Sequence, residues 1–432
     1  MNSAQPITSR RELVKVIIAA FIGTVIEWYD FFLYGMVAAL VFNKLFFPEF
    51  TPWAGTMAAY GTFAAGFVAR PLGGVVFGYI GDRYGRKGAL VWTLGIMGTA
   101  TFLVGCLPTY ASVGVWAPIL LVVLRFTQGI AVGGEWGGAV LMTVEHGHRG
   151  NRGFYGSWTQ AGVPMGNLLA AAAFFLVKKL PESDLLKWGW RIPFWFGIVL
   201  TIFGFIIRRH LGESPLFEQS AESTGEPHNP VLTVLRSKFK NILLVIGARL
   251  AENASFYVIT IFVLSYVKNQ LKLDEGLVLY GVLVGSIVEL VTIPLYGALS
   301  DRIGRRSVCM LGTILLSLYA YPFFMMLQSK DPTLIWLAVA IFLGVIHGAM
   351  YAPQAAFFAE LFGTSVRYSG ASLGYQLSAP VAGGPALNIA ALLLWWNDGK
   401  PWGVAGYLVA IGLISTISVL ITRETSKVDI AK

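Results

Sequence analysis

The stretch GTVIEWYDFFLYG, residues 23–35, places two carboxylates, Glu27 and Asp30, inside an apolar segment of membrane-spanning length. A second apolar segment contains the run RFTQGIAVGGEWGG, whose polar residues include Arg125, Gln128 and Glu135. A charged side chain near the middle of a bilayer costs roughly 2.5–3.5 kcal/mol on insertion scales, so it faces the protein interior or a water-filled cavity. The two stretches predict an all-α integral membrane protein that encloses ionisable groups, as transporters do.

The composition indicates a surface that faces lipid. Of the 432 residues, 56% are hydrophobic and 13% are charged, whereas a typical soluble domain has about 25% charged residues. The length is sufficient for about a dozen helices of roughly 20 residues with short connections. We expect spans at 15–42, 54–80, 88–108, 114–143, 152–178, 190–209, 239–267, 276–299, 307–327, 332–358, 366–396 and 402–422.

The longest polar stretch runs from Arg208 to Lys240 and divides the predicted spans six and six. Its middle, ESPLFEQSAESTGEPHNP, is rich in Pro, Glu and Ser, which is typical of a linker. A plain tether and a short amphipathic helix near Pro215–Gln219 are both compatible with it. We therefore predict an N-terminal six-helix bundle at 1–209, a cytoplasmic linker at 210–238 and a C-terminal six-helix bundle at 239–432.

The net charge of +9 has an explanation other than nucleic-acid binding. Most of the lysines and arginines between the predicted spans fall on the side that holds both chain termini, and the positive-inside rule assigns that side to the cytoplasm. The two cysteines, Cys106 and Cys309, lie in apolar segments and indicate neither a disulfide framework nor a metal site. We expect no cofactor and no nucleic-acid partner.

Two loops repeat one motif at equivalent places. GYIGDRYGRKG, residues 78–88, and GALSDRIGRRS, residues 297–307, share the frame G-x-x-x-D-R-x-G-R-[KR], and each follows the second predicted span of its half. Matching elements in two halves are typical of transporters that bind their substrate between the halves, near the middle of the membrane.

These loops resemble the signature of the major facilitator superfamily. The runs EWYDFFLYG (27–35), FVARPLGGVVFGYIGDRYGRK (67–87), LRFTQGIAVGGEWGG (124–138), WGWRIPFWFG (188–197) and RYSGASLGYQ (367–376) resemble its metabolite:proton symporter family. Within that family, the shikimate permeases and related organic-acid carriers are the most similar, and the osmolyte and 2-oxoglutarate carriers less so. The resemblance covers nearly the whole chain. It implies a plasma-membrane carrier of twelve helices in two six-helix bundles, driven by a proton gradient.

The charges of the repeated loops are candidates for gating. An aspartate in such a loop can cap the N-terminus of a neighbouring helix and accept hydrogen bonds from arginine, which would latch the two bundles in an outward-facing state. A simple positive-inside anchor is the alternative. The candidate gating residues are Asp82, Arg83, Arg86, Asp301, Arg302 and Arg305.

The first and fourth predicted spans hold the candidates for proton coupling. Glu27, Asp30 and Tyr34 share one helix face. In the proton-coupled sugar carriers of the superfamily, an acid on the first helix pairs with an arginine on the fourth. By that resemblance Asp30 is the proton acceptor and Arg125 its partner, with a permanent structural salt bridge as the alternative. Glu135 is a rival proton site, and Glu27 could take either part.

Further polar residues are candidates for substrate binding. Arg125 or Arg249 could hold a carboxylate through a bidentate guanidinium, amides could bind hydroxyl groups, and aromatic rings such as Trp28 could stack on a ring. For His347, a helix-packing hydrogen bond is an equal alternative. Arg70 is interpreted as interfacial or latch-related. The other candidates are Tyr34, Gln128, Trp136, Gln160, Asn167, Glu252, Tyr351, Gln354, Tyr375 and Gln376.

The sequence thus predicts a proton symporter that imports a small carboxylated metabolite by alternating access. Its expected partners are the organic acid, protons and the lipid bilayer; we expect a monomer in the cell inner membrane. A proton symporter of zwitterionic osmolytes and an efflux antiporter of drugs or organic anions are the alternatives. No G-x-x-x-x-G-K-[ST] motif occurs, which argues against an ATP-driven pump. Neither a nucleophile–base set nor a metal-binding motif is evident, so we expect no enzymatic activity.

Overall fold

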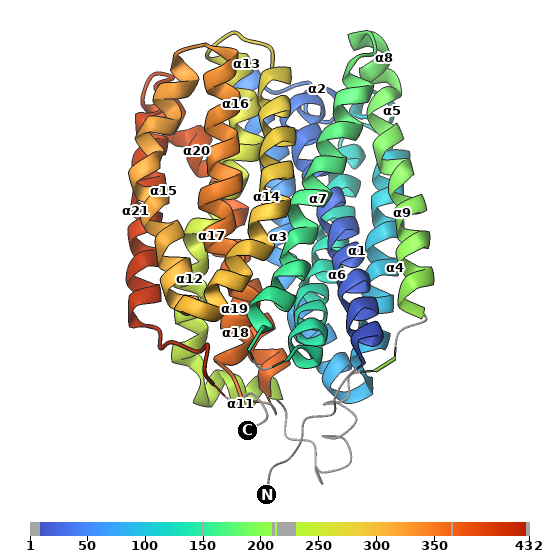
Figure 1. Ribbon diagram of the computed structural model, residues 1–432. Helices are drawn as coiled ribbons and strands as arrows, with labels where there is room; N and C mark the ends of the chain where they lie inside the picture. Colours follow the sequence, from blue (N-terminus) through green and yellow to red (C-terminus); the bar gives the residue numbers. More distant parts are fainter. Residues whose placement is uncertain (1–8, 149, 210–211, 214–229, 364–365, 429–432) are drawn as a thin grey trace, which may run out of the picture.

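The computed structural model describes residues 9–148, 150–209, 212–213, 230–363 and 366–428, and within these the fold is all-α (Figure 1). Twelve helices are long and apolar enough to cross a membrane, and they coincide with the predicted spans to within a few residues. Their principal segments are α1 (Arg10–Val37), α3 (Pro52–Tyr84), α4 (Arg86–Cys106), α6 (Trp116–His146), α7 (Arg152–Lys178), α9 (Ile192–Arg209), α12 (Phe239–Tyr257), α14 (Gly276–Ile303), α15 (Arg305–Gln328), α16 (Pro332–Ile341), α19 (Arg367–Ser378), α20 (Gly384–Trp396) and α21 (Trp402–Ile421).

Short helical segments connect or complete these spans. They are η1 (Ala38–Phe42), α2 (Asn43–Leu45), α5 (Tyr110–Val113), α8 (Glu182–Lys187), η2 (Gly189–Arg191), α11 (Pro230–Ser237), η3 (Val258–Phe262), α13 (Val263–Asn269), η4 (Phe342–His347), α17 (Gly348–Tyr351), α18 (Gln354–Glu360) and η6 (Ala379–Gly383). The segments η1, η3, η4 and η6 are π-helical turns inside spans. Such wide turns often occur at functional sites because they redirect side chains.

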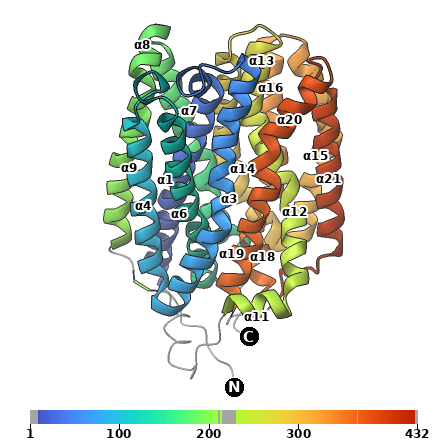
Figure 2. The same cartoon turned by 180° about the vertical axis from the view of Figure 1, so that it is seen from behind.

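The helices before and after the linker gather on opposite sides of the molecule (Figure 1). Where the two sides meet, α7 packs against α14, and α3 packs against α19 and α20 (Figure 2). The described chain ends emerge at one end of the helices (Figure 1). We keep the proposed division and call 1–209 the N-terminal half and 239–432 the C-terminal half.

The repeated loops form the sharp breaks α3–α4 and α14–α15. Gly85 has φ 106° and Gly304 has φ 102°, values that a residue with a side chain adopts only with strain. The next helix begins directly after each glycine, at Arg86 and Arg305. The motif therefore ends one span and starts the next within a single residue.

Glycines on α6 allow its backbone to come into direct contact with the backbone of α3. A Cβ atom added to Gly129 would lie 2.0 Å from the carbonyl oxygen of Gly66, and one added to Gly133 would lie 2.1 Å from that of Arg70. Glycine at such positions allows close packing of membrane helices. The contact fixes the depth of Arg70 relative to the polar residues of α6.

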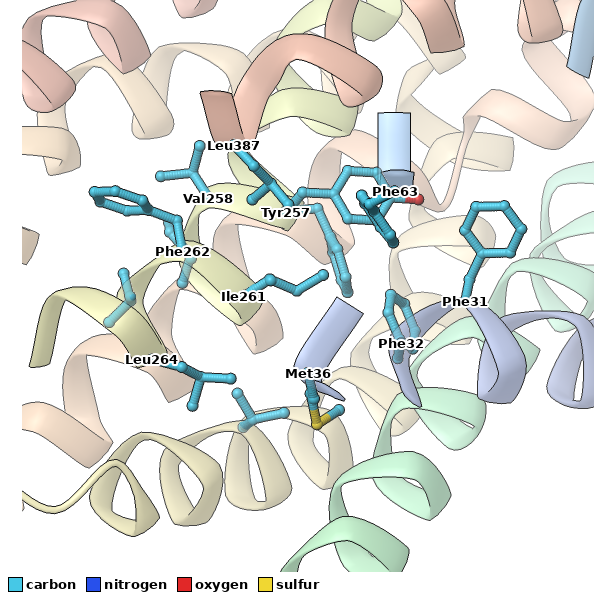
Figure 3. Close-up of a cluster of buried hydrophobic side chains, with 14 of the residues drawn as sticks. Phe31, Phe32, Met36, Phe63, Tyr257, Val258, Ile261, Phe262, Leu264 and Leu387 are labelled. Carbon is cyan, nitrogen blue, oxygen red and sulfur yellow. The ribbon is translucent and has the colours of Figure 1, made fainter. Parts of the chain in front are cut away.

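An apolar cluster fills the interface between the halves on the side away from the termini (Figure 3). It joins Phe31, Phe32 and Met36 of α1 to Tyr257 of α12 and Ile261 of η3, all buried. The outer faces of the spans carry exposed apolar side chains, for example Val199 on α9 and Leu295 on α14, as expected of helices that face lipid. The paired charges of the candidate site, such as Asp30 and Arg125, are buried inside this apolar envelope.

Candidate functional site

Asp30 and Arg125 are paired in the interior of the N-terminal half. Nη1 of Arg125 lies 3.5 Å from Oδ2 of Asp30, and the residues are 0% and 2% exposed, respectively. The amide of Gln128 donates to both carboxylate oxygens of Asp30, at 2.9 and 2.8 Å, and lies 3.0 Å from the hydroxyl of Thr101. The structure thus brings together the acid and the arginine that the sequence suggested, and adds a polar clamp around the acid.

Aromatic rings surround the guanidinium of Arg125. Its Cζ atom lies 3.7 Å from the ring centroid of Phe31 and 4.2 Å from that of Tyr34. Nη1 donates to Gln128, whereas Nε and Nη2 are buried without a hydrogen-bond partner. A buried arginine with unused donors can accept an anionic ligand at little further desolvation cost. The hydroxyl of Tyr34 already donates to Thr62 at 2.7 Å.

Arg70 lies in the same interior region, which corrects its interpretation as an interfacial or latch residue. It is 1% exposed, and its guanidinium lies 4.1 Å from the ring centroid of Phe31 and 5.5 Å from that of Trp28. The interpretation was wrong because α3 continues to Tyr84. Fourteen residues beyond Arg70 at 1.5 Å per residue amount to about 21 Å of helix.

Glu135 of α6 contacts α4 and α9, within the N-terminal half. Its carboxylate forms a salt bridge with Arg208 of α9 and accepts a hydrogen bond from Thr93 of α4 at 2.7 Å. Arg208 is 3% exposed, so it is an internal partner and not a free cytoplasmic charge. Glu27, the other rival proton site, is 2% exposed. Within the described part of the chain its carboxylate forms neither a hydrogen bond nor a salt bridge.

The C-terminal half contains a second buried arginine, Arg249. Its Nε lies 3.2 Å from Oε2 of Glu252, one turn along α12, and its Nη1 donates to the carbonyl oxygen of Tyr375 at 2.7 Å and to Ser378 at 2.8 Å. Its Cζ atom lies 3.2 Å from the ring centroid of Tyr375. Among the described residues, neither Nε nor Nη2 of Arg249 makes a hydrogen bond.

His347 connects two carboxylates of the C-terminal half. Its Nδ1 contacts Oε1 of Glu289 in a short polar contact, and its Nε2 lies 3.5 Å from Oε1 of Glu252. The ring also stacks on Tyr351 at a centroid distance of 5.2 Å. Glu289 falls within the predicted span 276–299 and is not among the candidate site residues, because only the fold shows that its side chain reaches His347.

Several predicted substrate ligands join the two halves to each other. Trp136 stacks on Tyr375 across the interface and donates from Nε1 to Gln160 at 3.0 Å. Gln160 in turn donates to the carbonyl oxygen of Tyr351 at 3.2 Å, and Asn167 donates to Ser286 at 3.2 Å. Other members of the predicted set are Gln376, which donates to the carbonyl oxygen of Val132 at 3.4 Å, and Gln354, whose amide is buried without a partner.

The gating loop of the C-terminal half contacts α7 at the end nearer the termini. Both oxygens of Asp301 accept backbone N–H groups at the start of α7, from Gly153 and Phe154, each at 2.9 Å, and Nη1 of Arg305 donates to Asp301 at 2.6 Å. Asp301 therefore caps a helix of the opposite half, as the motif suggested. Arg302 is exposed and makes no such contact.

In the gating loop of the N-terminal half, Asp82 and Arg83 are not among the residues whose side chains the structure describes. Arg86 forms a short salt bridge with Glu145 of α6. The carboxylate of Glu213 accepts the backbone N–H groups of Arg86 and Lys87, and Glu424 does the same for Arg305 and Arg306 in the other half. The two halves thus repeat a capping contact as well as a sequence motif.

Contacts also join the halves at the opposite end. Lys178 of α7 lies 2.5 Å from Asp274 and 3.6 Å from Glu275, which precede α14. Tyr60 and Ser265 are hydrogen-bonded at 3.0 Å. With the Asp301 contact, these interactions bring the halves together at both ends, so the structure is a closed form.

The chain is similar to known families and proteins over nearly its whole length. The family model described as Major Facilitator Superfamily matches residues 20–386 and 286–428. The shikimate transporter of Escherichia coli (strain K12) is 42% identical over 417 residues, 96% of this chain and 95% of that protein. The proline/betaine transporter of Salmonella typhimurium (strain LT2) is 34% identical over 428 residues, 96% of this chain and 84% of that protein.

The fold is similar to that of the proton:xylose symporter XylE bound to 6-bromo-6-deoxy-D-glucose. The TM-score is 0.76 with 15% sequence identity, covering 98% of each chain. At this identity the likeness bears on the fold alone.

Proposed function

The chain belongs to the major facilitator superfamily of membrane transporters, and from this premise we propose that it imports a small carboxylated metabolite together with protons. The similarity to a shikimate transporter supports a cyclic, hydroxylated organic acid as the substrate. We also propose that the protein acts as a monomer in the cell inner membrane, with both termini in the cytoplasm.

The buried pair of Asp30 and Arg125 carries the proposal. With Asp30 ionised, the carboxylate holds the guanidinium and the amide of Gln128. Protonation of Asp30 removes the charge that holds Arg125, whose unused donors then favour an external carboxylate. Proton binding and anion binding therefore support each other, which is the coupling that a symporter needs.

The ring and hydroxyl groups of such a substrate have candidate partners nearby. Trp136 and Tyr375 are stacked on each other and would have to separate to receive a substrate ring, and the buried amide of Gln354 has unused hydrogen-bonding atoms among the described residues. Arg249 offers a second guanidinium from the opposite half. A ligand held between Arg125 and Arg249 would contact both halves, and its binding would favour their closure around it.

Alternating access then follows from the two sets of end contacts. Breaking the Lys178–Asp274 contact opens the outer side, where Asp30 is protonated and the substrate enters. Breaking the Asp301 cap opens the cytoplasmic side, where both leave. One proton carried with one carboxylate moves no net charge, so the pH gradient drives this uptake; a second proton would add one elementary charge, which gains about 2.3 kcal/mol per 100 mV.

A zwitterionic substrate is the second candidate, and one observation favours it. Glu27 is a buried carboxylate without a polar partner among the described residues, next to Trp28, whose ring lies 6.4 Å from that of Tyr257. A buried carboxylate and the aromatic faces of nearby rings are the two kinds of group that bind a quaternary ammonium. The similarity to proline/betaine transporters supports the same candidate. No described contact favours an efflux antiporter.

The test is uptake by purified protein in liposomes with an imposed pH gradient, acidic outside. We expect accumulation of shikimate or a related organic acid, abolished by a protonophore. Betaine and proline serve as the competing probes in the same vesicles. Accumulation of betaine alone would replace the organic acid with the zwitterion, and gradient-driven efflux in place of uptake would overturn the symport.

A further inference from the structure

The C-terminal half holds a cluster of ionisable groups that the Asp30–Arg125 mechanism does not use. Glu252 from α12, Glu289 from α14 and His347 from η4 converge from three helices, and they are 4%, 0% and 0% exposed. His347 bridges the two acids, with Nδ1 against Glu289 and Nε2 3.5 Å from Glu252. We call these three residues the histidine cluster.

We propose that the histidine cluster is a second proton-binding site of the transporter, which takes up and releases one proton in each transport cycle. The inference rests on the proposed symport and adds to it a site in the opposite half from Asp30.

The geometry around the imidazole of His347 favours a charged ring. A ring nitrogen that faces a carboxylate needs a proton to form a favourable contact, and a neutral imidazole has a proton on one nitrogen only. His347 faces a carboxylate on both sides. Nε2 makes no hydrogen bond among the described residues, but at 3.5 Å from Glu252 it meets a negative charge, so an imidazolium is attracted on both sides. Loss of the proton on Nε2 would leave its lone pair opposed to a buried carboxylate.

The net charge of the histidine cluster and Arg249 also favours a protonated His347. Arg249 contributes one positive charge beside Glu252. With both glutamates ionised, a protonated His347 makes the four residues neutral, and a neutral His347 leaves one net negative charge in a buried region. An uncompensated buried charge is costly, so the cluster has a place for one exchangeable proton. The remaining titratable groups that face it among the described residues are weak acids: Tyr257 from α12, Tyr351 from α17, Tyr375 from α19 and Cys309 from α15.

Protonation of the histidine cluster is coupled to substrate binding through Arg249. Arg249 forms an ion pair with Glu252, and among the described residues neither its Nε nor its Nη2 makes a hydrogen bond. A substrate carboxylate that binds Arg249 competes with Glu252 and adds a negative charge, so a proton on the cluster favours the substrate-bound form. In the exchange a proton passes from water to the cluster on one side of the membrane and from the cluster to water on the other, and no other bond changes.

The backbone of this region can move the cluster. His347 is the last residue of the π-helical turn η4, and α17 follows directly. Conversion of such a turn to an α-helix shifts the register by one residue and would withdraw the imidazole from Glu289. The proton site thus has a means of changing its partners as the half changes shape.

The experiment measures the coupling ratio in proteoliposomes with the membrane potential clamped at zero and shikimate as the probe. Each coupled proton raises the limiting accumulation about tenfold per unit of pH gradient. We expect about a hundredfold for the wild type and about tenfold for His347→Gln. His146→Gln is the matched control, because His146 is also buried in a span but its one hydrogen bond among the described residues is to the carbonyl oxygen of Met142 in its own helix. It should retain the wild-type ratio. An unchanged ratio in His347→Gln would overturn the proposal.

A second measurement needs no transport. Nitrogen-15 NMR of histidine-labelled protein in nanodiscs follows the five histidines, and the resonance missing from His347→Gln identifies the cluster. We expect the chemical shift of this resonance to change with pH, and Glu289→Gln to move the pH at which the change occurs. If the chemical shift of the His347 resonance changes neither with pH nor in Glu289→Gln, the contact is a fixed structural one and the proposal of a second proton site is wrong. If no probe is transported but the resonance titrates, the proposed substrate fails and the proton site stands.

Discussion

Tyr375 of the C-terminal half stacks on Trp136 of the N-terminal half, with ring centroids 3.6 Å apart and planes 9° from parallel. The opposite face of Tyr375 carries the guanidinium of Arg249 at 3.2 Å. The stack of three groups connects a buried charge of one half to an aromatic ring of the other. A change in the position of Arg249 therefore acts directly on the contact that closes the interface.

Replacement of Trp136 should loosen the closed form. The stacked pair contributes about 0.5–1.5 kcal/mol beyond its buried area, and Trp136→Leu also removes the hydrogen bond to Gln160. We expect a broader distance distribution between spin labels at Gly150 and Ser307, which lie in opposite halves near the termini and are exposed. Trp136→Phe retains a ring and should fall between the two. A distribution in Trp136→Leu identical to the wild type would contradict this role.

Asp30→Asn should uncouple transport from the proton gradient. The substituted amide cannot become an anion, so the hold on Arg125 is permanently weakened, as it is in the protonated wild type. We expect uphill uptake in proteoliposomes to disappear while exchange of labelled for unlabelled substrate continues. Proton-driven accumulation by Asp30→Asn would refute the assignment.

Sequence patterns located the spans, but they did not locate the partners of the charges. Hydropathy and span length fix which segments are buried in lipid, and the twelve helices follow from that signal alone. The pairing of Glu135 with Arg208 and the position of Arg70 depend on how far each helix extends and which way it is turned. These are properties of packing, such as the backbone contact at Gly133, that a single sequence does not encode locally.

The cap of α7 by Asp301 should stabilise the form that is closed at the cytoplasmic end. A capping side chain is worth about 0.5–2 kcal/mol, so Asp301→Ala should shift the equilibrium by roughly two- to thirtyfold toward opening between Gly150 and Ser307. Asp331→Ala is the matched control. Asp331 caps α16 by accepting from Thr333 and Leu334 within its own half, so its loss should lower stability without opening the interface.

Gly133→Ala should destabilise the N-terminal half. The added Cβ atom would lie 2.1 Å from the carbonyl oxygen of Arg70, and this oxygen is part of a helix backbone that cannot move alone. We expect the melting temperature of Gly133→Ala to be several degrees below that of the wild type, as measured by fluorescence-detected size-exclusion chromatography. At Gly95 a Cβ atom would meet nothing within 4 Å, so Gly95→Ala should be neutral or slightly stabilising. Equal melting temperatures for the two variants would show that the α3–α6 contact adjusts.

The contact of Lys178 with Asp274 should close the outer end throughout the physiological pH range. The hydrogen bond from Lys178 lowers the pKa of Asp274, which lies in the turn before α14. A carboxylate with a depressed pKa gives its full stabilisation above its ordinary pKa of about 3.9, and the stabilisation is lost as the pH falls through the depressed value. Spin labels at the exposed residues Lys187 and Lys330 should therefore report the same outer closure at pH 5 and pH 8. Because Asp274 is exposed, salt should weaken the contact, and Asp274→Asn should open the outer end at every pH. Opening of the wild type between pH 8 and pH 5 would assign the outer gate to another titrating group.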